Sequence, residues 1–128
     1  RRMTWPLDLR EVEVKQALPP PQLKAREGAL LLATVPKGSR VVALDETGRN
    51  LDSVAFAALL GGWRDEGVPH AAFLIGGADG HDHPVRAAAD LTLSFGAMTW
   101  PHLLARAMLA EQLYRATTIL AGHPYHRA

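Results

Sequence analysis

The chain has 128 residues, of which 48% are hydrophobic and 21% charged, the size and balance of one globular domain with its own core. We therefore expect a single domain over residues 1–128. The sequence contains no cysteine, which excludes disulfides, thiolate metal sites and cysteine nucleophiles. A formal net charge of +1 gives no global positive field that would attract nucleic acid, so any contact with RNA must be local. No apolar stretch is long enough to cross a bilayer, so no membrane partner is expected.

The first part of the chain alternates between apolar runs and turn residues. Residues 9–14 alternate and predict a strand, and the prolines at 19–21 then interrupt regular structure. Residues 22–33 favour a helix. Residues 39–45 are a β-branched, apolar run that predicts a buried strand, followed by a turn at residues 46–50.

A second helix is expected after this turn. Asp52 or Ser53 can cap its start, and the Gly-Val-Pro at residues 67–69 ends it. Its apolar positions are Val54, Phe56, Ala57, Leu60 and Trp63. Residues 71–75 then predict a second buried strand.

The last third of the chain continues this alternation. It predicts a short helix at residues 84–89, a third strand at 91–95 and a long helix over 103–114. Strands that alternate with helices indicate an α/β fold with a parallel sheet flanked by helices. Such sheets bind ligands at the carboxyl ends of their strands. The loops expected there are residues 45–50, 76–83 and 96–102.

The second of these loops is rich in glycine but lacks a phosphate-binding motif. The spacing in residues 75–80, Ile-Gly-Gly-Ala-Asp-Gly, is not GxGxxG, and no lysine follows as a P-loop requires. The glycines would let the backbone approach an adenosine-like ligand closely. A tight turn after a buried strand accounts for the same pattern.

Two further segments concentrate polar side chains. The first segment contains histidine and aspartate side chains, which offer nitrogen and oxygen ligands for zinc or another divalent ion. It comprises Asp79, His81, Asp82 and His83. Its spacing matches no standard metal motif, so we expect a solvated turn there and no metal site. The other segment is His-Pro-Tyr-His-Arg at residues 123–127, which indicates either a docking element or a frayed terminus.

Several of these features together resemble one known family. They are the strand that runs into Leu74-Ile75-Gly76-Gly77 and Gly80, the later Pro101-His102, the Glu-Gln-Leu-Tyr-Arg-Ala at residues 111–116, and residues 123–127. The chain resembles the RlmH family, which are SPOUT-class methyltransferases of the large ribosomal subunit. The resemblance runs from about Val41 to the end of the chain and is most specific in the last helix and the tail.

The resemblance implies a particular fold and cofactor. Its fold is a parallel α/β sheet whose C-terminal segment threads a deep trefoil knot, an exception to the rule that chains do not thread loops. The knot forms the pocket for S-adenosylmethionine. A strand and a helix of the family precede the position of Arg1, so we expect this chain to lack them. The implied cofactor contacts are Leu44, Gly77, Gly96, Ala97, Met98, Thr99, Trp100 and Pro101.

The resemblance also implies the substrate, which is N3 of a pseudouridine in 23S ribosomal RNA on the assembled ribosome, in the cytoplasm. Family members work as homodimers with the active site at the interface. We expect Tyr125, His126 and Arg127 to approach the target nucleotide, with His126 as proton acceptor. Arg127 or Arg115 would stabilise negative charge. Two other hypotheses remain, a catalytically silent ribosome-binding module of this fold and a metal-dependent hydrolase that uses the histidine-rich loop.

Overall fold

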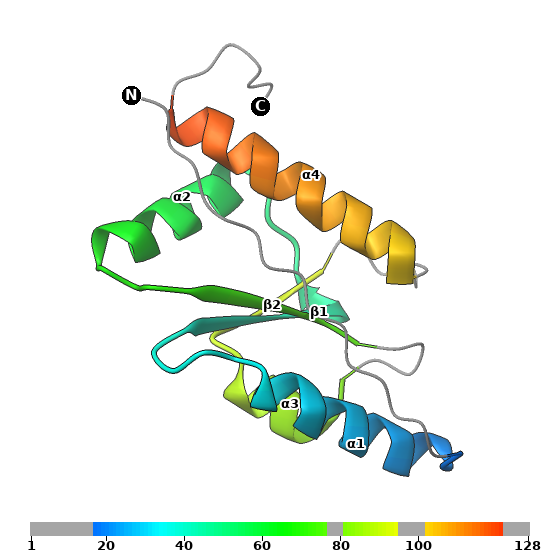
Figure 1. Cartoon of the computed structure of the whole chain (residues 1–128). Coiled ribbons are helices and arrows are strands. Elements are labelled where there is room, and N and C mark those ends of the chain that lie inside the picture. The colour runs from blue at the N-terminus through cyan, green and yellow to red at the C-terminus, as the bar shows by residue number, and fades with distance from the viewer. Residues whose placement is uncertain (1–16, 77–80, 95–101, 122–128) are drawn as a thin grey trace.

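A computed structural model describes residues 17–76, 81–94 and 102–121, in which helices and strands alternate along the chain (Figure 1). The strand expected at residues 9–14 lies outside the described residues. The elements are α1 (Pro20–Ala33), β1 (Arg40–Arg49), α2 (Ser53–Asp65), β2 (Ala71–Ile75), α3 (His83–Ala88), β3 (Leu91–Leu93) and α4 (His102–Leu120).

The described strands form one parallel sheet in the order β2-β1-β3, which confirms the predicted parallel α/β architecture. β1 is the central strand. Its residue Leu44 pairs with Ile75 of β2 and with Leu93 of β3. The carboxyl ends of the strands therefore lie at one edge of the sheet, as expected for βαβ units.

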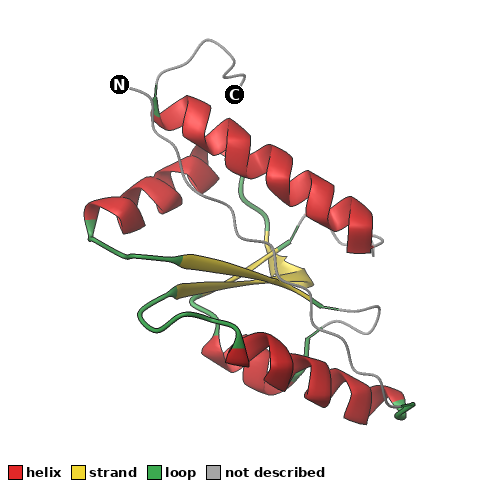
Figure 2. Cartoon of the chain, in the orientation of Figure 1, coloured by secondary structure: helices red, strands yellow, loops and turns green. Residues whose placement is uncertain are grey.

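Helices cover both faces of this sheet (Figure 2). α2 and α4 pack on one face, and α1 and α3 on the other (Figure 1). The core follows the twofold alternation of β1, because Val42 belongs to the cluster with α2 and α4 whereas Val41 and Ala43 belong to the cluster with α3. On the first face, the ring of Phe56 meets that of Phe73 edge-on at a centroid distance of 6.1 Å.

Local signals account for where most helices begin. Asp52 caps α2, since its Oδ1 accepts a hydrogen bond from the backbone N–H of Ala55 at 2.7 Å. Asp82 caps α3 in the same way, through the N–H of Val85. The prolines do not all interrupt regular structure as predicted. α1 begins at Pro20, because the first helical positions need no N–H partner and suit the fixed φ of proline.

The turn predicted at residues 46–50 is wrong, because β1 continues to Arg49. The residues that predicted the turn do form a local hydrogen bond, in which Asp45 Oδ1 accepts from the backbone N–H of Thr47 at 3.0 Å. The chain then returns to the sheet, and Arg49 pairs with Leu93, the residue that Leu44 also pairs with. Glycine permits this return, because a Cβ on Gly48 would lie 2.6 Å from backbone atoms of Thr92.

Candidate functional site

The carboxyl edge of the sheet brings together the chain positions from which the predicted cofactor segments start. Leu44 is half-buried on the central strand, flanked by Ile75 and Leu93. Gly77 follows Ile75 by two residues, and the segment Gly96 to Pro101 follows β3 closely. Of the implied cofactor contacts, only Leu44 lies within the described residues. The ends of β2 and β3 thus lie beside Leu44, where the regular pairing of β1 stops, and parallel sheets bind ligands at such an edge.

A polar cluster lies beside Leu44 at this edge. Arg86 of α3 donates from Nη1 to the backbone carbonyl of His81 at 2.7 Å. The same Nη1 lies 3.8 Å from Oδ2 of Asp45, whose side chain is only 7% exposed. The imidazole Nε2 of His81 lies 2.9 Å from the carbonyl oxygen of Leu74. We call Asp45, Arg86, His81 and the Leu74 carbonyl the edge clamp.

The surroundings of the edge clamp shift the pKa values of Asp45 and His81. Burial raises the pKa of Asp45, but the hydrogen bonds from Thr47 and the charge of Arg86 outweigh it, so the pKa lies below the ordinary 3.8. Burial is also the largest influence on His81 and lowers its pKa from the ordinary 6.5. Asp45 is therefore ionised and His81 neutral at pH 7. Since a carbonyl only accepts, the proton of His81 is on Nε2.

The edge clamp also bears on the metal hypothesis. His81 is 2% exposed and turned into the protein, whereas His83 is exposed at the start of α3. Asp79 lies outside the described residues. Among residues 17–76, 81–94 and 102–121, no group of three or more His, Asp or Glu side chains could hold a metal ion.

The expected catalytic residues belong to α4 and to the tail. Arg115 is an ion-pair partner of Glu111 one turn earlier, at 2.8 Å, with 23% of its side chain exposed. It stands 13 residues after His102, about 20 Å along the helix axis from the start of α4. Ser53 at the start of α2 donates to Gln112 at 2.7 Å and so helps to hold this part of α4. Tyr125, His126 and Arg127 lie outside the described residues.

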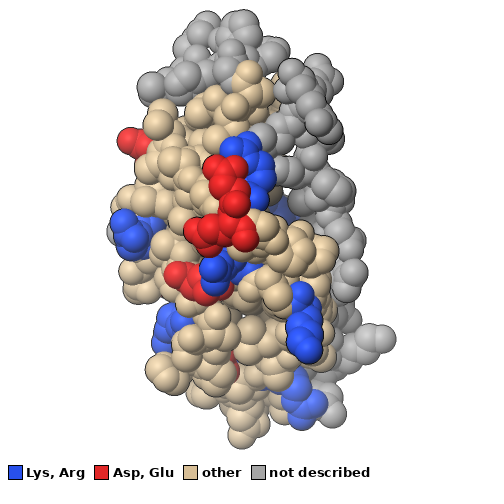
Figure 3. Space-filling view, turned by 90° about the vertical axis from the view of Figure 1, so that its left-hand side faces the viewer, with Lys and Arg blue, Asp and Glu red and all other residues tan. Residues whose placement is uncertain are grey.

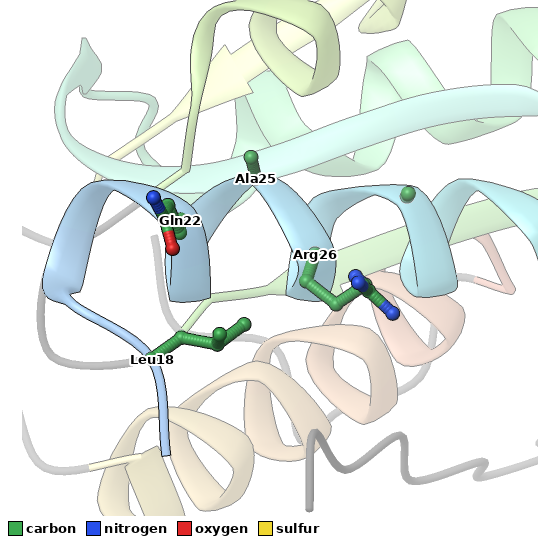
Figure 4. Close-up of a pocket in the computed structure, with 5 residues that line it drawn as sticks. Leu18, Gln22, Ala25 and Arg26 are labelled. Carbon is green, nitrogen blue, oxygen red and sulfur yellow. The ribbon is translucent and has the colours of Figure 1, made fainter. Parts of the chain in front are cut away.

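Two other surfaces, beside α1 and at the edge where the strands begin, show no comparable cluster of buried polar groups among the described residues. A hollow beside α1 is lined by Leu18, which precedes the helix, and by Gln22, Ala25, Arg26 and Ala29 of the helix itself (Figure 4). The edge where the strands begin carries interleaved acidic and basic side chains (Figure 3). There Arg40 lies 3.3 Å from Glu66 and 3.7 Å from Asp90. Within the described parts of the chain, no helix is long and apolar enough to span a membrane.

Comparison with known proteins defines the class. Residues 1–126 match the family described as "Predicted SPOUT methyltransferase". A protein of Paramagnetospirillum magneticum named ribosomal RNA large subunit methyltransferase H is 65% identical over 127 residues, which cover 99% of this chain and 84% of the relative. The protein of the same name from Rhodospirillum centenum is 59% identical, with the same coverage. A protein of the same name from Rhodopseudomonas palustris is 54% identical over 122 residues, which cover 95% of this chain and 76% of the relative.

The chain therefore belongs to the SPOUT methyltransferases and, within them, to the RlmH family, as the sequence motifs indicated. Sequence reasoning missed the edge clamp as an arrangement, although it had considered His81 as a metal ligand. Asp45 was expected at the end of a strand and the start of a candidate ligand loop, and Arg86 was not singled out. Their separation of 41 residues leaves no local signal, and only the packing of α3 beside β1 brings them together.

Proposed function

We propose that the protein transfers a methyl group from S-adenosylmethionine to N3 of a pseudouridine in large-subunit ribosomal RNA, on the assembled ribosome and in the cytoplasm. The observation that carries the proposal is that β2 and β3 end beside Leu44 of β1, and that the segments with the other implied cofactor contacts follow these two strands. The names of relatives at 54–65% identity support the RNA substrate.

The described residues at this edge fit such a cofactor. Leu44 and Ile75 are half-buried apolar side chains that pack against the core, and Leu93 is buried beside them. Apolar walls suit an adenine ring and a thioether chain better than they suit phosphates. When bound, S-adenosylmethionine supplies an electrophilic methyl group. The proposal includes the trefoil knot of the family, with the segment Gly96 to Pro101 and Gly77 completing the pocket.

The protein's own task is alignment and charge control, because methyl transfer from a sulfonium is an in-line displacement that needs a deprotonated nitrogen. His126 would accept the N3 proton, with Tyr125 and Arg127 against the nucleotide. Arg115 would support negative charge, although it lies about 20 Å along α4 from the helix start. The proposed homodimer reconciles this distance, because α4 of one protomer would then serve the edge of its partner.

The test is methyl transfer to ribosomes that lack the modification, with labelled S-adenosylmethionine. We expect incorporation into large-subunit RNA of assembled ribosomes, and much less into the same RNA free of protein, because a chain of formal charge +1 gains little from phosphate contacts alone. Mapping should place the label on a single pseudouridine. Cofactor binding without incorporation into either RNA would reject the proposed activity.

A further inference from the structure

The segment formed by α1 and the turn after it, residues 17–39, carries cations that have no acidic partner. Its charged side chains are Lys24, Arg26, Glu27 and Lys37. None of the three cations forms a side-chain ion pair or hydrogen bond with another described residue. Arginines of other elements do pair, at 2.8–3.8 Å from a carboxylate oxygen, and these are Arg40, Arg64, Arg86 and Arg115. The positive charge of residues 17–39 is therefore available to an outside partner.

The two helical layers of the described chain differ in charge in the same sense. The layer of α1 and α3, with the turn and cap that belong to it, has four cations and two acids, which are Lys24, Arg26, Lys37, Arg86, Glu27 and Asp82. The layer of α2 and α4 has three cations and four acids, which are Arg64, Arg106, Arg115, Asp52, Asp65, Glu66 and Glu111.

This division of charge is visible on the surface. Figure 3 shows lysine and arginine atoms over the lower part of one face, where the layer of α1 and α3 lies, and most of the acidic atoms above them. A chain with a formal net charge of only +1 thus has a local positive side, which can attract a polyanion although the whole molecule does not.

The hollow beside α1 makes one of these cations accessible to a bulky anion. Gln22 and Arg26 stand one helical turn apart and offer amide and guanidinium N–H donors there (Figure 4). The rest of the lining is apolar, with Leu18, Ala25 and Ala29. Because short alanine side chains flank Arg26, a sugar-phosphate group can approach its guanidinium, which binds phosphate oxygens through two parallel hydrogen bonds.

We propose that this α1 surface, defined by Lys24, Arg26, Lys37 and the hollow around Arg26, binds the phosphate backbone of ribosomal RNA. Charge complementarity identifies the partner, because three unpaired cations and one acid on a helix and its turn match a run of phosphates. The inference rests on the proposed function for the identity of the RNA. The surface includes no residue placed in the cofactor pocket or at the target nucleotide. Its contacts position the ribosome, so they act on ribosome affinity and not on the chemical step.

The experiment measures the KM for ribosomes at several salt concentrations in a full-length triple variant, Lys24→Gln, Arg26→Gln and Lys37→Gln. Each phosphate contact makes binding more sensitive to salt, so the slope of log(1/KM) against log salt should be shallower by about 2–3 in the triple variant and by about 1 in Arg26→Gln alone. The matched control is Arg64→Gln, because Arg64 is also a helical arginine, is 41% exposed and pairs with Asp65 at 2.9 Å. Its slope should equal that of the wild type.

Two further measurements separate affinity from catalysis. The kcat and the Kd for S-adenosylmethionine should be the same in all four proteins. An unchanged KM and slope in the triple variant, or the same change in Arg64→Gln, would overturn the inference. Weaker ribosome binding with an unchanged salt slope would also overturn it, because the partner of the surface would then not be a phosphate backbone.

Failure of the proposed function is a distinct outcome. If the wild type does not methylate ribosomes, the proposed activity is wrong, and co-sedimentation with large ribosomal subunits over the same salt range then tests the surface directly. The wild type should bind with the steeper salt dependence. Equal binding by wild type and triple variant would reject the α1 surface.

Discussion

Asp90 and Val41 exchange two hydrogen bonds where β1 and β3 begin to pair. The N–H of Val41 donates to Asp90 Oδ2 at 2.7 Å, and the N–H of Asp90 donates to the Val41 carbonyl at 2.7 Å. Because Val41 is 7% exposed, its N–H has little access to water. Asp90→Ala should therefore lower the free energy of unfolding by about 1–3 kcal/mol, the cost of an unpaired buried donor.

Urea denaturation measures this loss, and Asp90→Asn is the matched control. The amide oxygen can still accept from Val41, while the negative charge that faces Arg40 at 3.7 Å is removed. Since that ion pair is largely exposed, its loss should matter little. Equal destabilisation by both substitutions would show that charge, and not the hydrogen bond, is what Asp90 contributes.

Two helical glycines should respond in opposite directions to alanine. On Gly28, a Cβ would lie 2.7 Å from Asp82 Oδ1 and 2.8 Å from Val85 Cγ2, so Gly28→Ala should cost about 1–3 kcal/mol of stability. On Gly62, nothing lies within 4 Å, so Gly62→Ala should stabilise the protein by about 0.5–1 kcal/mol. Thermal unfolding of both variants tests the pair. A stabilised Gly28→Ala would contradict the close packing of α1 on α3.

The accuracy of the sequence predictions depended on how local the signals were. Asp52 and the Gly-Val-Pro at residues 67–69 bracket α2 correctly, because caps and terminators act within a turn. The alternation of β1, by contrast, did not reveal that the strand resumes after Thr47, since this depends on the close approach of Thr92 to Gly48. Val54 was expected among the apolar positions of α2, yet it is 42% exposed.

In the candidate site, too, features with a local sequence signal were predictable and features that depend on packing were not. The position of Leu44 beside the ends of β2 and β3 was predictable, because parallel strands end at one edge. The edge clamp was not, because it depends on which of two nearby histidines faces inward. Nothing in the local sequence distinguishes His81, which is buried, from His83, which is exposed at the start of α3. Packing decides this, through the contact of His81 with Leu74.

Acid should weaken the fold through His81. Burial lowers its pKa from 6.5, although the Leu74 hydrogen bond and the nearby Asp45 and Asp82 oppose this. The folded state therefore binds fewer protons than the unfolded state as the pH falls below 6.5. The contribution of His81 to stability is present above that pH and is lost as the pH falls through the folded-state value. Asp45 contributes in the same direction only below about pH 3.8, where its unfolded form titrates.

Urea denaturation between pH 7 and pH 5 tests this contribution. His81→Gln retains a donor but does not titrate, so its free energy of unfolding should fall less over this range than that of the wild type. His70→Gln is the control, since His70 is exposed, and it should follow the wild type. Identical pH dependence in wild type and His81→Gln would remove His81 as the titrating group.

A bulky side chain at Gly77 should abolish cofactor binding. If the glycine backbone forms a wall of the pocket, the side chain in Gly77→Leu would occupy the space of the ligand. Calorimetry with S-adenosylmethionine provides the measurement, and Gly62→Leu is a suitable control because open space surrounds that position. Unchanged affinity in Gly77→Leu would exclude Gly77 from the site.

Removal of residues 123–128 should separate catalysis from cofactor binding. The proposed proton acceptor, His126, and the nucleotide contacts Tyr125 and Arg127 are lost together, so methylation of cognate ribosomes should fall at least about 100-fold. The Kd for S-adenosylmethionine should stay close to that of the full chain, because the edge around Leu44 is untouched.

Single substitutions in the tail measure how much each residue contributes to the effect of this deletion. His126→Gln should lower kcat with a pH dependence that differs from that of the wild type, since the titrating acceptor is removed. Arg127→Met should act on the KM for the ribosome, because a guanidinium holds phosphate or developing charge. Full methylation by the shortened chain would reject the tail as the substrate-facing element. Parallel loss of cofactor binding would place the tail in the cofactor pocket instead.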